Sequence, residues 1–62
     1  MAFDSQELAS FKNENGEVKL TKLGEAFIVG ATPKYGDQVT NSHGDQLIAE
    51  RDFSYFQHYF TK

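Results

Sequence analysis

The chain has 62 residues, a formal net charge of −3, nine aromatic side chains (three Tyr and six Phe) and no cysteine. This length is near the lower limit for independent folding, so we expect residues 1–62 to form a single domain. The lack of cysteine excludes disulfides and cysteine-based zinc sites. No apolar run reaches the ~20 residues of a membrane span, and no signal peptide is recognisable at the N-terminus. We therefore expect a complete cytoplasmic protein.

Residues 3–15 are predicted to form a short helix. Asp4 is a favourable N-cap, and Glu7 three residues later completes a capping-box pattern. Asn15 followed by Gly16 would end this helix, with the glycine in the left-handed conformation.

A β-hairpin is the alternative for the N-terminal segment, because Asn-Gly is also a strong hairpin signal. Residues 9–14 would then pair with residues 17–22, which alternate polar and apolar and are predicted to form a half-buried strand in either case. Residues 25–32 are apolar on both faces and predict a central strand. Residues 37–41 predict a short third strand at an edge of the sheet.

The last fifteen or so residues contain most of the aromatic side chains, and their spacing favours a helix over residues 46–60 with Asp45 as N-cap. The apolar residues that fall within one arc of about 160° are Ile48, Ala49, Phe53, Tyr55, Phe56, Tyr59 and Phe60. The alternative is a strand over residues 46–51 followed by a helix from Asp52.

These elements predict a small α+β domain in the order α-β-β-β-α. An N-terminal helix precedes a three-stranded antiparallel sheet, and the aromatic C-terminal helix packs on one face of that sheet. The alternative fold is a small SH3-like β-barrel.

The sequence contains no arrangement typical of catalysis, and we predict neither an enzyme nor a catalytic residue. Ser54 and His58 would share a helix face, but no carboxylate is placed to orient the histidine. The nearest approach to a metal site is a polar group comprising Asp37, Asn41, His43 and Asp45. Its spacing does not match a calcium loop, and turn chemistry explains its composition. We therefore predict no metal and no cofactor.

The remaining use of the surface is contact with another macromolecule. Tyrosine is enriched at protein interfaces because it combines a large apolar body with a polar tip. We predict a small non-enzymatic regulator or inhibitor, of the type that phages and mobile elements often carry, with Tyr35, Tyr55 and Tyr59 as its anchors. The width of the apolar arc on the C-terminal helix also predicts a homodimer, with another protein as the further partner.

The alternative function is binding of single-stranded nucleic acid. Lys19, Lys22 and Lys34 would attract the phosphate backbone, and Tyr35 would stack on a base. The net negative charge of the chain disfavours this alternative, because phosphate neutralisation supplies most of the affinity of such proteins.

Overall fold

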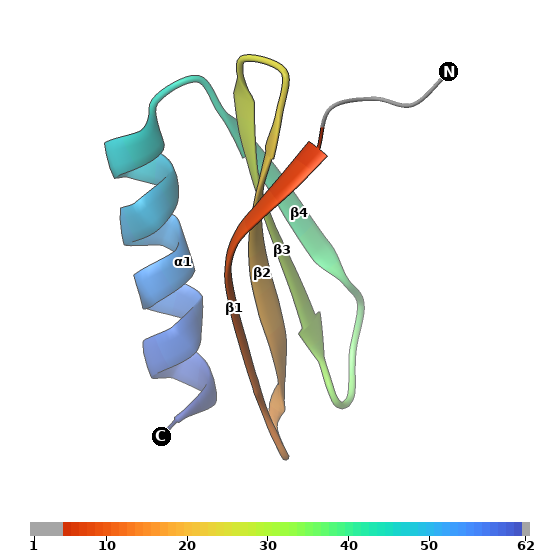
Figure 1. Cartoon of the computed structure of the whole chain (residues 1–62). Coiled ribbons are helices and arrows are strands. Elements are labelled where there is room, and N and C mark those ends of the chain that lie inside the picture. The colour runs from red at the N-terminus through yellow and green to blue at the C-terminus, as the bar shows by residue number, and fades with distance from the viewer. Residues whose placement is uncertain (1–4, 62) are drawn as a thin grey trace.

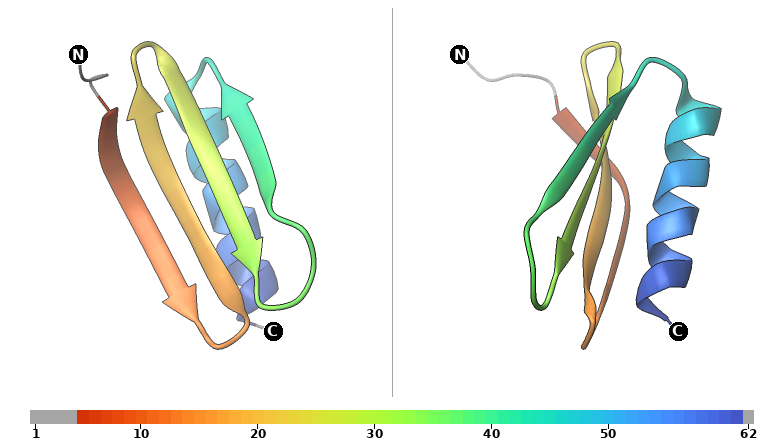
Figure 2. Two further views of the ribbon diagram at one scale, coloured as in Figure 1. Left: turned by 90° about the vertical axis from the view of Figure 1, so that its right-hand side faces the viewer. Right: turned by 180° about the vertical axis from the view of Figure 1, so that it is seen from behind.

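A computed structural model describes residues 5–61 as four strands followed by one helix (Figure 1). The elements are β1 (Ser5–Asn13), β2 (Gly16–Leu23), β3 (Ala26–Pro33), β4 (Val39–His43) and α1 (Gln46–Phe60). The strands form one antiparallel sheet in the order β1-β2-β3-β4, so each strand pairs with its neighbour in the sequence. The helix lies across one face of this sheet, and the opposite face carries no covering element among the described residues (Figure 2).

The predicted N-terminal helix is wrong, because this part of the chain is strand β1. Its pairing with β2 runs from Ser5↔Leu23 to Asn13↔Gly16, with one irregularity between Glu7 and Ala9. The hairpin alternative is therefore the correct reading. Capping signals act only within one turn of a helix, whereas β1 gains the full length of β2 as a partner and packs two half-buried side chains on the core. The proposed cap, Asp4, lies outside the described residues.

The other three strands lie close to their predicted positions, which makes the sheet four-stranded rather than three-stranded. In β2 and β3, buried side chains that face the helix alternate with half-buried or exposed ones, as expected for a sheet covered on one side. The core residues are Val18, Leu20, Val29, Ala31, Ala49 and Phe60. The small β fold named as the alternative is compatible with this high strand content.

Helix α1 begins at Gln46, so residues 46–51 are helical and not a strand. Asp45 is its N-cap, as predicted, and its carboxylate accepts a hydrogen bond of 2.8 Å from the backbone N–H of Leu47. Ala49 and Phe60 are buried on the sheet side of the helix, and Phe53 and Phe56 pack against the same core. The aromatic stretch is thus chiefly a core element.

Candidate functional site: an aromatic pocket at one end of the sheet

The β1–β2 turn is tied to the C-terminal end of α1 by two asparagines. The side-chain amide of Asn13 donates to the backbone carbonyl of Phe60 at 2.9 Å, and that of Asn15 donates to the same carbonyl at 2.6 Å. The carbonyl oxygen of Asn13's own side chain accepts from the backbone N–H groups of Asn15 and Gly16, at 2.8 and 3.2 Å. A helix end has carbonyls without intrahelical partners, and here the hairpin supplies the missing donors.

Gly16 leaves the space that the Phe60 ring occupies. A Cβ atom on Gly16 would lie 3.0 Å from Cζ of Phe60, 2.9 Å from the backbone oxygen of Thr32 and 3.0 Å from Cα of Pro33. The turn itself consists of Glu14 and Asn15, and Gly16 is already the first residue of β2 with a negative φ. The glycine is therefore required by packing, not by the backbone conformation of the turn.

A hollow of about 580 Å³ lies beside this junction, and we call it the end pocket. It lies where the β1–β2 turn, the end of β3 and the last turn of α1 meet. Its lining residues are Glu14, Asn15, Pro33, Lys34, Tyr35, Tyr59 and Phe60. The backbone N–H of Lys34 donates to the carbonyl of Asn15 at 2.9 Å, which joins the β1–β2 turn to the end of β3. Three segments distant in the sequence thus hold the walls of the end pocket in place.

Two of the three predicted tyrosine anchors, Tyr35 and Tyr59, line the end pocket together. Tyr35 is 84% exposed, with Nζ of Lys34 lying 5.6 Å from the centre of its ring, and Tyr59 is 57% exposed. The third, Tyr55, is 65% exposed one helical turn before Tyr59 and is not part of the lining. Glu14 and Asn15 complete the pocket but were absent from the predicted site, since the Asn-Gly signal marks a turn without showing what the turn contacts.

The structure does not bring together the three lysines of the nucleic-acid alternative. Lys19 lies on the open face of the sheet, 3.7 Å from the carboxylate of Glu17. Lys22 lies toward the opposite end of β2, with Nζ 5.9 Å from the centre of the Phe27 ring. Lys34 follows β3 at the end pocket. Three cations at separate places form no continuous track for a phosphate backbone.

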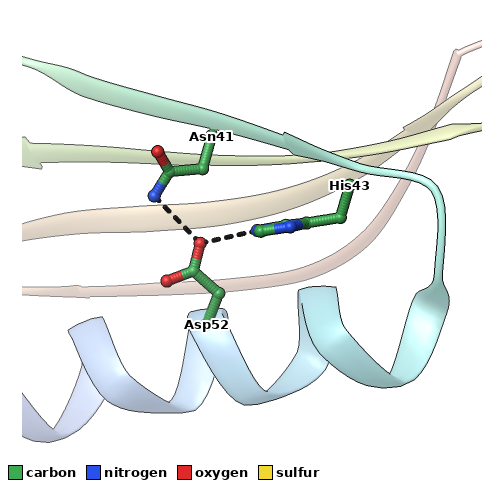
Figure 3. A network of polar contacts seen from close by, with 3 residues as sticks. All are labelled: Asn41, His43 and Asp52. Carbon is green, nitrogen blue, oxygen red and sulfur yellow. Dashed lines mark hydrogen bonds and ion pairs between the residues drawn. The ribbon is translucent and has the colours of Figure 1, made fainter.

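A polar network joins β4 to the middle of α1 (Figure 3). The side-chain amide of Asn41 donates to a carboxylate oxygen of Asp52 at 3.0 Å, and Nε2 of His43 donates to the same oxygen at 2.9 Å. Residues two apart on a strand face the same side, so both reach the helix. Two members of the polar group considered for metal binding, Asn41 and His43, therefore meet an aspartate from outside that group.

The other two members of that polar group do not join this network. Asp45 caps α1, and Asp37 is exposed in the connection between β3 and β4. Within residues 5–61, no three or more His, Cys, Asp or Glu side chains gather closely enough to hold a metal ion. In the same range, no helix combines the length and apolarity needed to cross a membrane.

Comparison with known proteins gives no relative: no family model, curated protein or solved structure matches this chain. The end pocket and the polar network are therefore interpreted from their own chemistry.

Proposed function

We propose that this chain is a small, non-enzymatic, cytoplasmic regulator or inhibitor that binds another protein through the end pocket. The observation that supports this most strongly is the presence of two exposed tyrosines, Tyr35 and Tyr59, on the wall of one preformed hollow. Tyrosine is among the residues that most often dominate the energy of protein interfaces.

The fixed walls of the end pocket favour this use. Binding loses less free energy when the contact surface is already ordered, and the bonds from Asn13 and Asn15 to Phe60 hold the hairpin turn against the helix. Glu14 and Lys34 place one charge of each sign among the lining residues. Such charges would orient a partner, while the overall net charge of −3 would favour the approach of a basic one.

The polar network supports a non-enzymatic role. Asp52 and His43 form the kind of pair that assists a nucleophile in hydrolases. Here the oxygen that contacts His43 also accepts from Asn41, which gives the pair a clear structural use in joining β4 to α1.

Site-specific photo-cross-linking in the source cells tests this function. A photoreactive amino acid replaces Tyr35, and a matched probe replaces Leu47, which is 69% exposed near the other end of α1. We expect a discrete protein adduct from position 35 and none from position 47.

The purified partner should then bind the Tyr35→Ala variant at least ~10-fold more weakly than the unmodified chain or the Leu47→Ala variant. Equal binding of all three proteins, or equal adducts from both probe positions, would overturn the proposal.

A further inference from the structure

The two edge strands of the sheet differ in their protection against pairing with another chain. Strand β1 carries the charged residues Glu7 and Lys12, and its pairing with β2 has an irregularity before Ala9. Charges and bulges are the usual devices that prevent an edge strand from pairing. Strand β4, with the sequence Val-Thr-Asn-Ser-His, has no Lys, Arg, Asp, Glu or Pro, and its register with β3 is regular.

An apolar flank of α1 lies on the same side as β4. Ile48, Asp52 and Tyr55 lie on one helix stripe, because positions four and seven residues apart point in nearly the same direction. Asp52 contacts β4, so this stripe is directed toward β4 rather than β1. Ile48 is 49% exposed and Tyr55 is 65% exposed, and Val39 at the start of β4 is also exposed.

We propose that β4 pairs with β4 of a second copy of this chain to form a symmetric dimer. An antiparallel pair centred on Asn41 places Val39 opposite His43 of the second copy and Thr40 opposite its Ser42. No two like charges meet across this pair, which matters for a chain with a net charge of −3. The two sheets then join into one of eight strands, and a two-fold axis makes each contact occur twice.

The surface involved is large enough for a weak dimer. An aromatic side chain has roughly 150–250 Å² of surface, so Tyr55 contributes on the order of 100 Å² at its exposed fraction. With Val39, Ile48 and the strand itself, each copy would bury on the order of 500 Å². The total of about 1,000 Å² is at the lower limit for a specific interface, so we expect a weak, reversible dimer.

This dimer does not depend on the proposed function, because none of its residues lines the end pocket. Antiparallel pairing of β4 also places the two end pockets at opposite ends of the joined sheet. The dimer can therefore fail while the end pocket still binds its partner, and the reverse also holds.

Sedimentation equilibrium of the full chain, from about 1 µM to about 1 mM, tests the dimer. We expect a reversible change from monomer to dimer, and a strict monomer at the highest concentration would overturn the proposal. The double variant Thr40→Glu/Ser42→Glu places like charges opposite each other across the pair and should weaken the dimer at least ~10-fold.

Ser10→Glu is the matched control for that variant, since Ser10 is exposed on β1 and lies opposite Lys19. It should leave the dimer unchanged. A dimer lost with Ser10→Glu but kept in the double variant would assign the interface to β1 and refute the proposal.

Amide hydrogen exchange of the unmodified chain tests the same strand without any substitution. The amides of β4 that point away from β3 should exchange more slowly as concentration rises, while those on the outer edge of β1 should not change. Slowing at β1 alone, or at neither edge, would contradict pairing through β4.

Discussion

The two ends of α1 are held in different ways. At the C-terminal end, Phe60 is buried against Gly16. Its carbonyl accepts hydrogen bonds from the side chains of Asn13 and Asn15, which are more than forty residues earlier in the sequence. At the N-terminal end, the cap is the neighbouring Asp45, Ala49 is buried on the sheet, and the large side chains of Leu47 and Ile48 are 69% and 49% exposed. The end pocket lies at the C-terminal end. Hydrogen bonds to a distant hairpin thus hold the end of the helix that we propose for binding, while the cap at the other end comes from the residue next to the helix.

The largest expected effect is at Phe60. Phe60→Ala removes a ring that is 4% exposed, and such changes in a core typically cost about 3–5 kcal/mol. A domain of this size has a total stability of roughly 3–9 kcal/mol, so the variant should lose at least about a third of its stability and at most all of it. Urea denaturation followed by circular dichroism measures the loss.

Leu47→Ala gives the comparison at the N-terminal end. Its side chain is 69% exposed, and the free energy of unfolding should change by less than about 0.5 kcal/mol. Similar losses for the two variants would show that the ends of the helix are equally important for stability.

Gly16→Ala should give the next largest loss, about 1–3 kcal/mol, because the added methyl group overfills a packed site. Two of the three atoms that the methyl group would approach, the carbonyl oxygen of Thr32 and Cα of Pro33, belong to the backbone of β3. A backbone atom cannot rotate away as a side chain can. Chemical denaturation of the purified variant measures this loss.

Gly44→Ala is the matched control at the start of the helix. No atom lies within 4 Å of a Cβ added there, and the variant should be as stable as the unmodified chain or slightly more stable. A Gly16→Ala variant of unchanged stability would refute the close packing of Phe60 on β2.

The same contrast explains which features could be predicted from the sequence. Asp45 could be identified as a cap because its partner, Leu47, is two residues away. The ring spacing of α1 and the alternation of β2 are likewise local patterns. From sequence alone Gly16 predicts only a stop or a turn, because the ring that needs its space is more than forty residues later. The predicted N-terminal helix is wrong for a different reason: Asn15-Gly16 is both a helix stop signal and a hairpin signal, and pairing with the adjacent strand β2 outweighs a capping pattern.

The candidate site was predictable only in part. Tyr35, Tyr55 and Tyr59 are all exposed, as expected from residue type and helical spacing. Tyr35 and Tyr59 share a pocket because the end of β3 meets the end of α1. The sequence of neither segment alone predicts that meeting point. Glu14 and Asn15 reach the pocket only through the hairpin.

The middle of the helix offers an intermediate test. Asp52→Ala leaves the side chains of Asn41 and His43 without their shared acceptor in a partly buried site, at a cost of about 1–2 kcal/mol. Denaturation of this variant and of Glu50→Ala provides the measurement. Glu50 accepts a hydrogen bond from Gln46 on the exposed surface. Removing the Glu50 side chain should change the free energy of unfolding by less than about 0.5 kcal/mol. Equal effects would mean that the network does not join β4 to α1.

The smallest expected effect is at the cap. Asp45→Ala leaves the backbone N–H of Leu47 without its side-chain acceptor, and loss of an N-cap typically costs about 1 kcal/mol. In a domain of this size, thermal unfolding should then occur about 4–8 °C lower. Asp45→Asn keeps the acceptor oxygen and should restore most of the lost stability. If Asp45→Asn is as unstable as Asp45→Ala, the negative charge near the helix N-terminus, and not the hydrogen bond, holds this end of α1.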